Sequence, residues 1–351
     1  MTPNASPPGR VTLSDVAKAS GLSRATVSLV LRGSPLVHAD TRARVEAELK
    51  RQGYVYHRGA ANLRGRTSTA VALVINDLSN PFFAEFAAGV DEALATAGFV
   101  TLLGSTGESV ERQQAVLASL LEHDPAGIIL SPAEGSDGAR LRALVGDRTP
   151  VLVFNRQLHD GTTEAGWDFL ALDNQRGARL ATEYLLDLGH RRIAFFGGHR
   201  DSSSCRQRRE GYREAFAAAG ITPEPQWLVE CAPTRLEAAG QTGALFVRDP
   251  APTAAVCYND AVALGLMAGL SARGRRAGHD FAVIGFDDIP EASVSSPPLT
   301  TIAAAPRERG RQAAELILQR LRDPTQPPIS TVAPVHLVLR DSDMPLQRSA
   351  A

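Results

Sequence analysis

Six side chains suited to holding a small polar molecule follow short apolar runs of this sequence. The runs are VALVI, VLVF, RIAFFGG, TAAVCY and VIGF. The six residues are Phe82, Phe83, Arg156, Arg208, Asn259 and Asp287. Asn80 and Asn155 follow the same runs, and Arg208 lies at the start of the helix expected after RIAFFGG. Guanidinium, amide and carboxylate groups form paired hydrogen bonds, and aromatic rings cover apolar faces of a ligand. If the runs are parallel strands, ligands bind beyond their carboxyl ends, so these side chains predict one binding site.

Structural interpretations of the same residues stay open. Phe82 and Phe83 could be core residues of the helix that they open, and Arg156 could be an ion-pair partner only. The neighbouring Asp260 and Asp288 are expected to be helix caps.

No pattern typical of catalysis accompanies this predicted site. The sequence lacks G-x-S-x-G, G-x-x-x-x-G-K-[ST] and H-E-x-x-H motifs, and no G-x-G-x-x-G follows a strand-like run. Its eight histidines are scattered without metal-ligand spacing. We therefore expect no enzyme activity, no metal and no cofactor.

Length and composition indicate a globular protein of two or three domains. The chain has 351 residues, of which 44% are hydrophobic, so it can bury a sizeable core. It has no apolar run of membrane-spanning length, and its start lacks the apolar segment of a signal peptide. We expect a cytoplasmic protein with no membrane partner. The widely spaced Cys205, Cys231 and Cys257 are expected to be buried reduced thiols.

Basic charge is concentrated in the first part of the chain. Residues 1–68 hold 11 Lys and Arg against 4 Asp and Glu, a net charge of +7, whereas the remainder holds 26 against 34, a net charge of −8. A small basic module therefore precedes a large acidic one. Such a distribution fits a module that contacts a phosphate backbone, although a solvated basic face gives the same count.

The basic module shows a helix-turn-helix pattern. In TLSDVAKASG, Thr12 and Asp15 form a version of the capping box and Gly21 is placed to end the helix. In SRATVSLVLRG, Ser23 is a good N-cap, and Val27, Val30 and Leu31 recur at helical spacing. Two short helices joined by a glycine-containing turn form this motif.

Two further helices are expected in the same module. ADTRARVEAELKRQG places Val45 and Leu49 one turn apart and ends at Gly53. The segment 58–66, RGAANLRGR, is too short to be helical by itself in water and should fold only when it docks onto a partner. From Thr69 onward, strand-like apolar runs alternate with helical patterns, which predicts parallel sheets in an α/β module.

In this order, the motifs resemble the lactose-repressor family of bacterial transcription regulators. The similar segments are TLSDVAKASGLSRATVSLVLRG, TRARVEAELKRQGY, AANLRG, INDLSNPFF, LDN, LGHRRIAFFGG, RREGY, YNDAVALG, VIGFDD and PPLTTI. They extend over about residues 11–341, and their shared order is far more specific than any single motif.

The resemblance implies which residues contact DNA. They are Thr12, Ser23, Arg24, Ala25, Thr26, Ser28, Leu29, Asn62 and Leu63. The second helix would lie in the major groove, where Arg24 could read a guanine and Leu29 a thymine methyl group. Many relatives carry arginine at the position of Leu29, which suggests a different operator, unless Leu29 packs against Val45 or the hinge. Leu63 would wedge into the minor groove, unless it is simply a linker residue.

The resemblance also implies the domain organisation. A small all-α helix-turn-helix DNA-binding domain, residues 11–56, would be followed by a hinge helix and linker, 57–68. An α/β effector-binding and dimerisation domain, 69–342, would follow, with two periplasmic-binding-protein-like lobes and two parallel, Rossmann-like sheets. The expected lobes are about 69–162 with 300–325, and about 163–299 with 326–342, joined by three crossovers.

The implied function is sequence-specific transcriptional regulation, with repression as the expected direction. A homodimer would bind a near-palindromic double-stranded operator, and a small-molecule effector would control its affinity. The resemblance implies effector-binding roles at Phe82, Phe83, Arg156, Arg208, Asn259 and Asp287. The tail after Arg340 has no leucine heptads, so a dimer is expected. Aromatic, arginine, asparagine and aspartate side chains suit a sugar or polyol, but also a purine or an acidic metabolite. The alternative is a cytoplasmic ligand-binding sensor whose basic module serves another partner.

Overall fold

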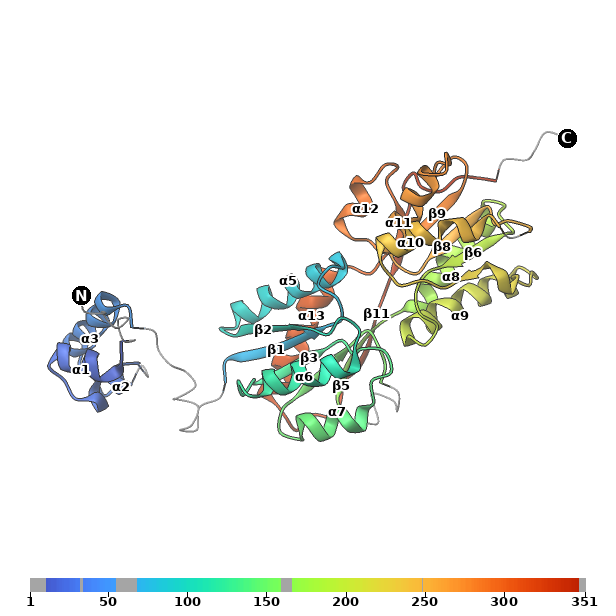
Figure 1. Ribbon diagram of the computed structural model, residues 1–351. Helices are drawn as coiled ribbons and strands as arrows, with labels where there is room; N and C mark the ends of the chain where they lie inside the picture. The colour runs from blue at the N-terminus through green and yellow to red at the C-terminus, as the bar shows by residue number, and fades with distance from the viewer. Residues whose placement is uncertain (1–10, 32–33, 55–67, 159–165, 248, 347–351) are drawn as a thin grey trace, which may run out of the picture. The chain divides into compact units, whose positions relative to one another are not determined.

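The computed structural model describes residues 11–31, 34–54, 68–158, 166–247 and 249–346, in two compact units, 1–67 and 68–351 (Figure 1). The described part of the first unit contains three helices. These are α1 (Leu13–Ser20), α2 (Arg24–Leu31) and α3 (Ala39–Gln52).

Local capping sets both ends of α1, the start of α2 and the end of α3, as the sequence predicts. The Thr12 hydroxyl accepts from the Asp15 amide and the Asp15 carboxylate accepts from the Thr12 amide, which completes the capping box of α1. The Ser23 hydroxyl accepts from the Thr26 amide at the start of α2. Gly21 and Gly53 end α1 and α3 with φ angles of 65° and 62°, a left-handed backbone that glycine adopts without strain.

A small apolar core joins the three helices. Its buried members are Val16, Ala17, Val27, Val30 and Val45. Leu31 and Leu49 pack against this core from partly buried positions. The apolar faces expected for α2 and α3 are therefore confirmed.

The second unit is built on two six-stranded sheets, as expected for two lobes. The first sheet is parallel throughout, in the order β11-β5-β4-β3-β1-β2. Its strands are β1 (Ala70–Ile75), β2 (Val100–Ser105), β3 (Gly127–Leu130), β4 (Val151–Phe154), β5 (Asp168–Leu172) and β11 (Ser330–Ala333). The second sheet has the order β12-β10-β9-β8-β6-β7, and only β12 is antiparallel to its neighbour. Its strands are β6 (Ile193–Phe196), β7 (Leu228–Val229), β8 (Ala254–Cys257), β9 (Ala282–Asp287), β10 (Thr300–Ala303) and β12 (His336–Val338).

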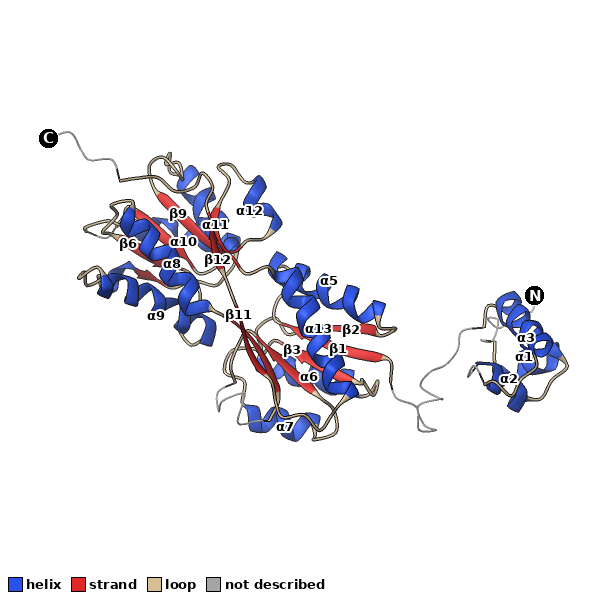
Figure 2. Cartoon of the chain, turned by 180° about the vertical axis from the view of Figure 1, so that it is seen from behind, coloured by secondary structure: helices blue, strands red, loops and turns tan. Residues whose placement is uncertain are grey.

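Helices cover both faces of each sheet (Figure 2). In the first lobe they are α5 (Pro81–Thr96), α6 (Val110–Leu121), α7 (Gly138–Val145) and α13 (Pro306–Arg322). In the second lobe they are α8 (Asn174–Asp187), α9 (Ser203–Ala218), α10 (Arg235–Gln241), α11 (Asp260–Ser271), α12 (Pro290–Val294), η1 (Pro225–Trp227) and η2 (Thr242–Leu245). None of the helices in the described part of the chain is long and apolar enough to cross a membrane.

Glycine permits one very close helix contact in the first lobe. A Cβ atom at Gly89 of α5 would lie 1.9 Å from the Arg307 carbonyl oxygen, and one at Gly310 of α13 would lie 2.1 Å from the Phe86 carbonyl oxygen. No side chain fits at either position, so the two backbones approach directly. This contact fixes α5, which carries Phe82 and Phe83, against α13.

The chain passes between the lobes three times, as the resemblance implies, but the expected lobe boundaries are wrong at three strands. β5 pairs with β4 and β11 pairs with β5, so both belong to the first sheet instead of the second. β10 pairs with β9, so it belongs to the second sheet instead of the first. The crossovers follow directly after these strands. A short apolar run predicts a strand, but it does not predict the partner of that strand. The pairing depends on hydrogen bonds between residues that are far apart in the sequence.

The three cysteines are buried and free, as expected. Burial raises the pKa of the Cys205 and Cys231 thiols to about 11. These thiols are therefore protonated and unreactive at neutral pH.

Candidate functional site

A cavity of about 380 Å³ in the second unit is lined by residues of both lobes. Its volume suits a small molecule. The first lobe contributes Asp77, Asn80, Phe82, Phe83, Gly107, Glu108, Asn155 and Arg156. The second lobe contributes His199, Arg208, Ala232, Pro233, Thr234, Tyr258, Asn259 and Asp287. The structure thus brings all six residues predicted from the strand ends to one cavity.

The aromatic wall of the cavity is the start of α5. The Asn80 side chain caps this helix by accepting from the Phe82 amide at 3.1 Å. The rings of Phe82 and Phe83 meet edge to face, with centroids 5.2 Å apart, and both residues are buried in the apolar core. Each phenylalanine is therefore a core residue that also lines the cavity, and its contact with a ligand stays a prediction.

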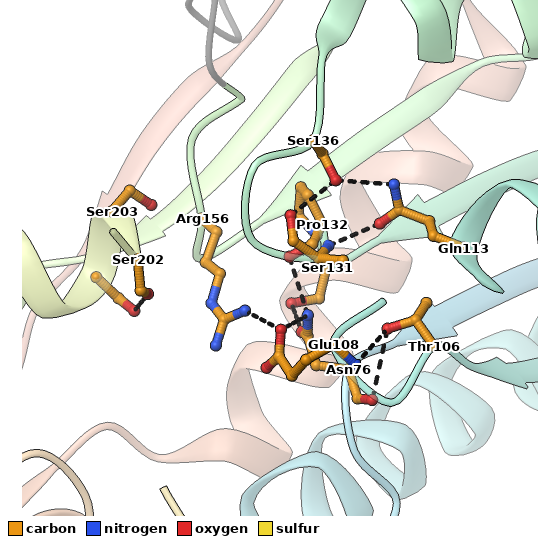
Figure 3. Close-up of polar contacts among 12 residues, drawn as sticks. Asn76, Thr106, Glu108, Gln113, Ser131, Pro132, Ser136, Arg156, Ser202 and Ser203 are labelled. Carbon is orange, nitrogen blue, oxygen red and sulfur yellow. Dashed lines mark hydrogen bonds and ion pairs between the residues drawn. The ribbon is translucent and has the colours of Figure 1, made fainter. Parts of the chain in front are cut away.

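Arg156 is an ion-pair partner within the first lobe. Its Nη1 donates to Oε2 of Glu108 at 2.6 Å (Figure 3). The residue is only 5% exposed, and its Nε atom has no hydrogen-bond partner among the described residues. Arg156 thus keeps one buried donor that no described residue satisfies.

Glu108 is a cavity residue that the sequence reasoning missed. It lies in the turn between β2 and α6 with a φ angle of 63°, and its amide donates to the Thr106 hydroxyl. Asn76 donates to the same Oε2 atom as Arg156, at 3.2 Å, and also to the Pro132 carbonyl (Figure 3). The strand-end rule could have found Glu108, because β2 ends three residues before it.

Arg208 is the fixed cation of the second lobe. Its Nε donates to Oδ1 of Asn174 at 2.9 Å, and its Nη1 donates to the Tyr258 carbonyl. The guanidinium lies 3.6 Å from the ring centroid of Phe286 and 4.9 Å from that of Tyr258. Hydrogen bonds and two aromatic rings therefore hold the group in one orientation.

Asp287 faces Arg208 with little other support. Its Oδ1 lies 3.8 Å from the Nη2 atom of Arg208, and the residue is 4% exposed. Burial raises the pKa of Asp287 well above its ordinary value, although Arg208 opposes this change. Its φ angle of 129° is unusual for a residue other than glycine, and such strain is typical of binding sites.

The two expected helix caps are wrong. Asn259, not Asp260, caps α11, because its Oδ1 atom accepts from the Val262 amide at 2.9 Å. Asp260 is fully buried, and its carboxylate accepts from the Ile289 amide and the Thr301 hydroxyl. Asp288 is paired with Arg340 at 2.6 Å. Sequence spacing could not distinguish adjacent polar residues at one helix start.

The candidate DNA-contacting surface lies on α2 in the first unit. Arg24 and Ala25 are exposed, while Thr26, Ser28 and Leu29 are partly exposed. The hydroxyls of Ser23 and Thr26 are 2.9 Å apart. Among the described residues, Leu29 is not one of the side chains packed on the core that contains Val45. Thr12 caps α1, whereas Asn62 and Leu63 lie outside the described residues.

No group of three or more histidine, cysteine, aspartate or glutamate side chains in the described ranges could hold a metal ion. The arrangement of the cavity supports binding through hydrogen bonds, ion pairs and aromatic contacts. The fold and the cavity define a two-lobed ligand-binding module, and the first unit is a helix-turn-helix module.

Comparison with known proteins gives the same two modules. Residues 12–56 match the model of bacterial regulatory proteins, lacI family, and residues 182–342 match a periplasmic binding protein-like domain. The maltose regulon regulatory protein MalI of Escherichia coli K12 is 31% identical over 338 residues, covering 94% of this chain and 98% of the relative. The repressor PurR of Vibrio cholerae is 32% identical over 316 residues, covering 89% and 92%.

A solved structure agrees with these relatives. The lac repressor dimer bound to operator and the anti-inducer ONPF is similar with a TM-score of 0.84 and 28% identity, over 96% of this chain and all of that one. The chain belongs to the lacI family of bacterial regulatory proteins. It is a DNA-binding transcriptional regulator, and the members of this family are regulators rather than enzymes.

Proposed function

We propose that this chain is a repressor that binds a near-palindromic operator as a homodimer and responds to a sugar-like effector held between its lobes. The observation that carries the proposal is the shared cavity. The six predicted residues come from five separate segments of both lobes and line this cavity together. The same chain also carries a helix-turn-helix unit. It acts in the cytoplasm, where bacterial DNA lies, and has no catalytic role.

On the DNA side, α2 enters the major groove. Arg24 is the base-reading side chain, because an exposed arginine can form a bidentate pair with guanine. Ala25, Ser28 and Leu29 supply smaller contacts to base edges, and Ser23 and Thr26 lie near the phosphates. Thr12 and Asn62 are further DNA contacts, and Leu63 is the minor-groove wedge. The net charge of +7 over residues 1–68 supports this contact with a polyanion.

On the effector side, the ligand acts by preferring one arrangement of the lobes. Arg208, Asn259 and Asp287 belong to the second lobe, whereas Phe82, Phe83 and Arg156 belong to the first. A molecule that contacts both sets stabilises one degree of closure, and the three crossovers are the places where the backbone can bend. Because binding equilibria are linked, this preference changes operator affinity by the ratio of the ligand's affinities for the two states.

A salt titration tests the proposal. Fluorescence anisotropy would measure binding of the full chain to a duplex from the region upstream of its own gene, with a random duplex as control. Neutralising about eight phosphates gives a slope of roughly −7 in log K against log salt. Equal binding of both duplexes in every ligand condition would contradict the proposal and favour the ligand-binding sensor.

A ligand screen tests the effector part separately. Thermal-shift measurements against sugars, nucleosides and organic acids would show a ligand as a rise in Tm, because a ligand that binds only the folded state stabilises it. Each ligand found would then be added to the operator titration. A ligand that raises Tm but leaves operator affinity unchanged would contradict the allosteric part.

A further inference from the structure

Both arginines that line the cavity already have carboxylate partners. Arg156 donates to Glu108 at 2.6 Å in the first lobe, and Arg208 lies 3.8 Å from Asp287 in the second. Both arginines are at least nine-tenths buried, at 5% and 3% exposure. Each lobe therefore presents a guanidinium and a carboxylate together, instead of an unpaired positive charge.

Acidic side chains outnumber arginines around the cavity. Asp77 is a third carboxylate of the lining, against two arginines. Glu134 lies close enough to Arg156 and Glu108 to interact with both, and burial raises its pKa. His199, also in the lining, faces Glu230 at 4.0 Å. Each arginine of the lining therefore has a carboxyl group beside it, and the shorter of the two contacts is that of Glu108 with Arg156.

The Arg156–Glu108 pair offers an acceptor to a ligand. Both hydrogen bonds that Glu108 accepts from described side chains, from Arg156 and Asn76, go to its Oε2 atom, which leaves Oε1 for a ligand. A hydroxyl group both donates and accepts, whereas a phosphate or carboxylate group only accepts.

We propose that the cavity takes an uncharged polyhydroxylated ligand, a sugar or polyol, and that Glu108 excludes the phosphorylated and carboxylated forms of that ligand. This inference rests on the proposed function, because it names the class of effector for the same cavity. Glu108 acts in two ways. Its carboxylate accepts a ligand hydroxyl, and its charge neutralises Arg156, which would otherwise be a buried anion receptor.

The test compares neutral and charged probes on the full chain and on Glu108→Gln, which keeps the shape and one acceptor but removes the charge. Calorimetry would measure Kd for D-glucose, D-ribose and cellobiose, and for glucose 6-phosphate, ribose 5-phosphate and gluconate. Asp147→Asn is the control, because Asp147 is an exposed carboxylate paired with an arginine, Arg142, but absent from the lining.

We expect the native protein to prefer the neutral form of its best sugar by about 100-fold more than Glu108→Gln does, because removal of one like charge at roughly 6 Å changes this ratio by that factor. Asp147→Asn should leave this preference unchanged. Equal or tighter binding of the charged form by the native protein, or an unchanged preference in Glu108→Gln, would overturn the proposal.

Inorganic phosphate provides a second probe, which tests the role of Glu108 even if no sugar of the panel binds. Glu108→Gln leaves Arg156 buried without its counter-charge, so phosphate at about 10 mM should raise its Tm more than that of the native protein or Asp147→Asn. No such gain would overturn the inference. A neutral sugar that binds without changing operator affinity would contradict the proposed function only, whereas release of the operator by a sugar phosphate would contradict this inference only.

Discussion

The buried carboxyl group of Asp260 makes the free energy of unfolding depend on pH. Burial raises the pKa of its carboxyl from 3.8 to about 6, while the hydrogen bonds from Thr301 and Ile289 oppose this rise and Asp288 adds to it. An acid with a raised pKa binds its proton more tightly in the folded state. The corresponding stability is therefore complete below pH 3.8 and is lost as the pH rises through about 6.

The size of this loss follows from the pKa. At about 1.4 kcal/mol per pKa unit, a rise from 3.8 to about 6 corresponds to roughly 3 kcal/mol of unfolding free energy. Asp260→Asn removes the charge and keeps both contacts, because an amide oxygen can accept from Ile289 and an amide nitrogen can donate to Thr301. We expect the variant to match the native protein near pH 4 and to be about 3 kcal/mol more stable at pH 8.

Urea unfolding between pH 4 and pH 8 would measure this difference. The two tryptophans, Trp167 and Trp227, both lie in the second unit, where they are buried, so their fluorescence reports on that unit alone. Asp147→Asn serves as the exposed control. A variant Asp260→Asn that is less stable than the native protein at pH 8 would mean that the negative charge of Asp260 stabilises its contact with Ile289, after β9. That result would refute the conclusion that burial of this charge costs stability.

Three further predictions concern the two units. Arg24→Ala should weaken operator binding about 10- to 100-fold in an anisotropy titration and random-duplex binding far less, whereas Arg51→Ala on α3 should change the two equally. Leu29→Arg should change the preferred base at one symmetric pair of operator positions in a selection from randomised duplexes, and an unchanged preference would mean that Leu29 does not face DNA. Gly310→Ala should lower the free energy of unfolding in urea by about 1–3 kcal/mol, because its Cβ atom would lie 2.1 Å from the Phe86 carbonyl oxygen. A loss below about 0.5 kcal/mol would show that α5 and α13 move apart at little cost.

Features that depend on neighbouring residues could be predicted from the sequence. The capping box of Thr12 and Asp15, the Ser23 cap and the glycine at the end of α3 involve residues a few positions apart. Their hydrogen bonds form within one helical turn, so the sequence contains both partners. The starts of α1 and α2 and the end of α3 followed from them.

Features that depend on distant pairing could be predicted only in part. The strand-end rule predicted that Arg156 and Asp287 line one cavity. It needs to know only that each residue lies at the carboxyl end of a strand, and the local sequence shows this. It could not assign β10 to a sheet, since its pairing with β9 competes with other parallel partners. Nor could it identify the pairing of Arg156 with Glu108, because 48 residues separate the two and the turn that presents Glu108 has a left-handed backbone.

The three crossovers also bear on how such a protein can be inherited and recombined. Each lobe is assembled from chain segments that are interrupted by segments of the other, so exchanging one lobe with a relative requires a matched junction at each of the three crossovers. The helix-turn-helix unit, by contrast, is contiguous, and one junction near residue 67 transfers it whole. A single recombination event can therefore give this sensor a new operator, whereas a new effector is reached more easily by point substitutions at cavity residues such as Glu108.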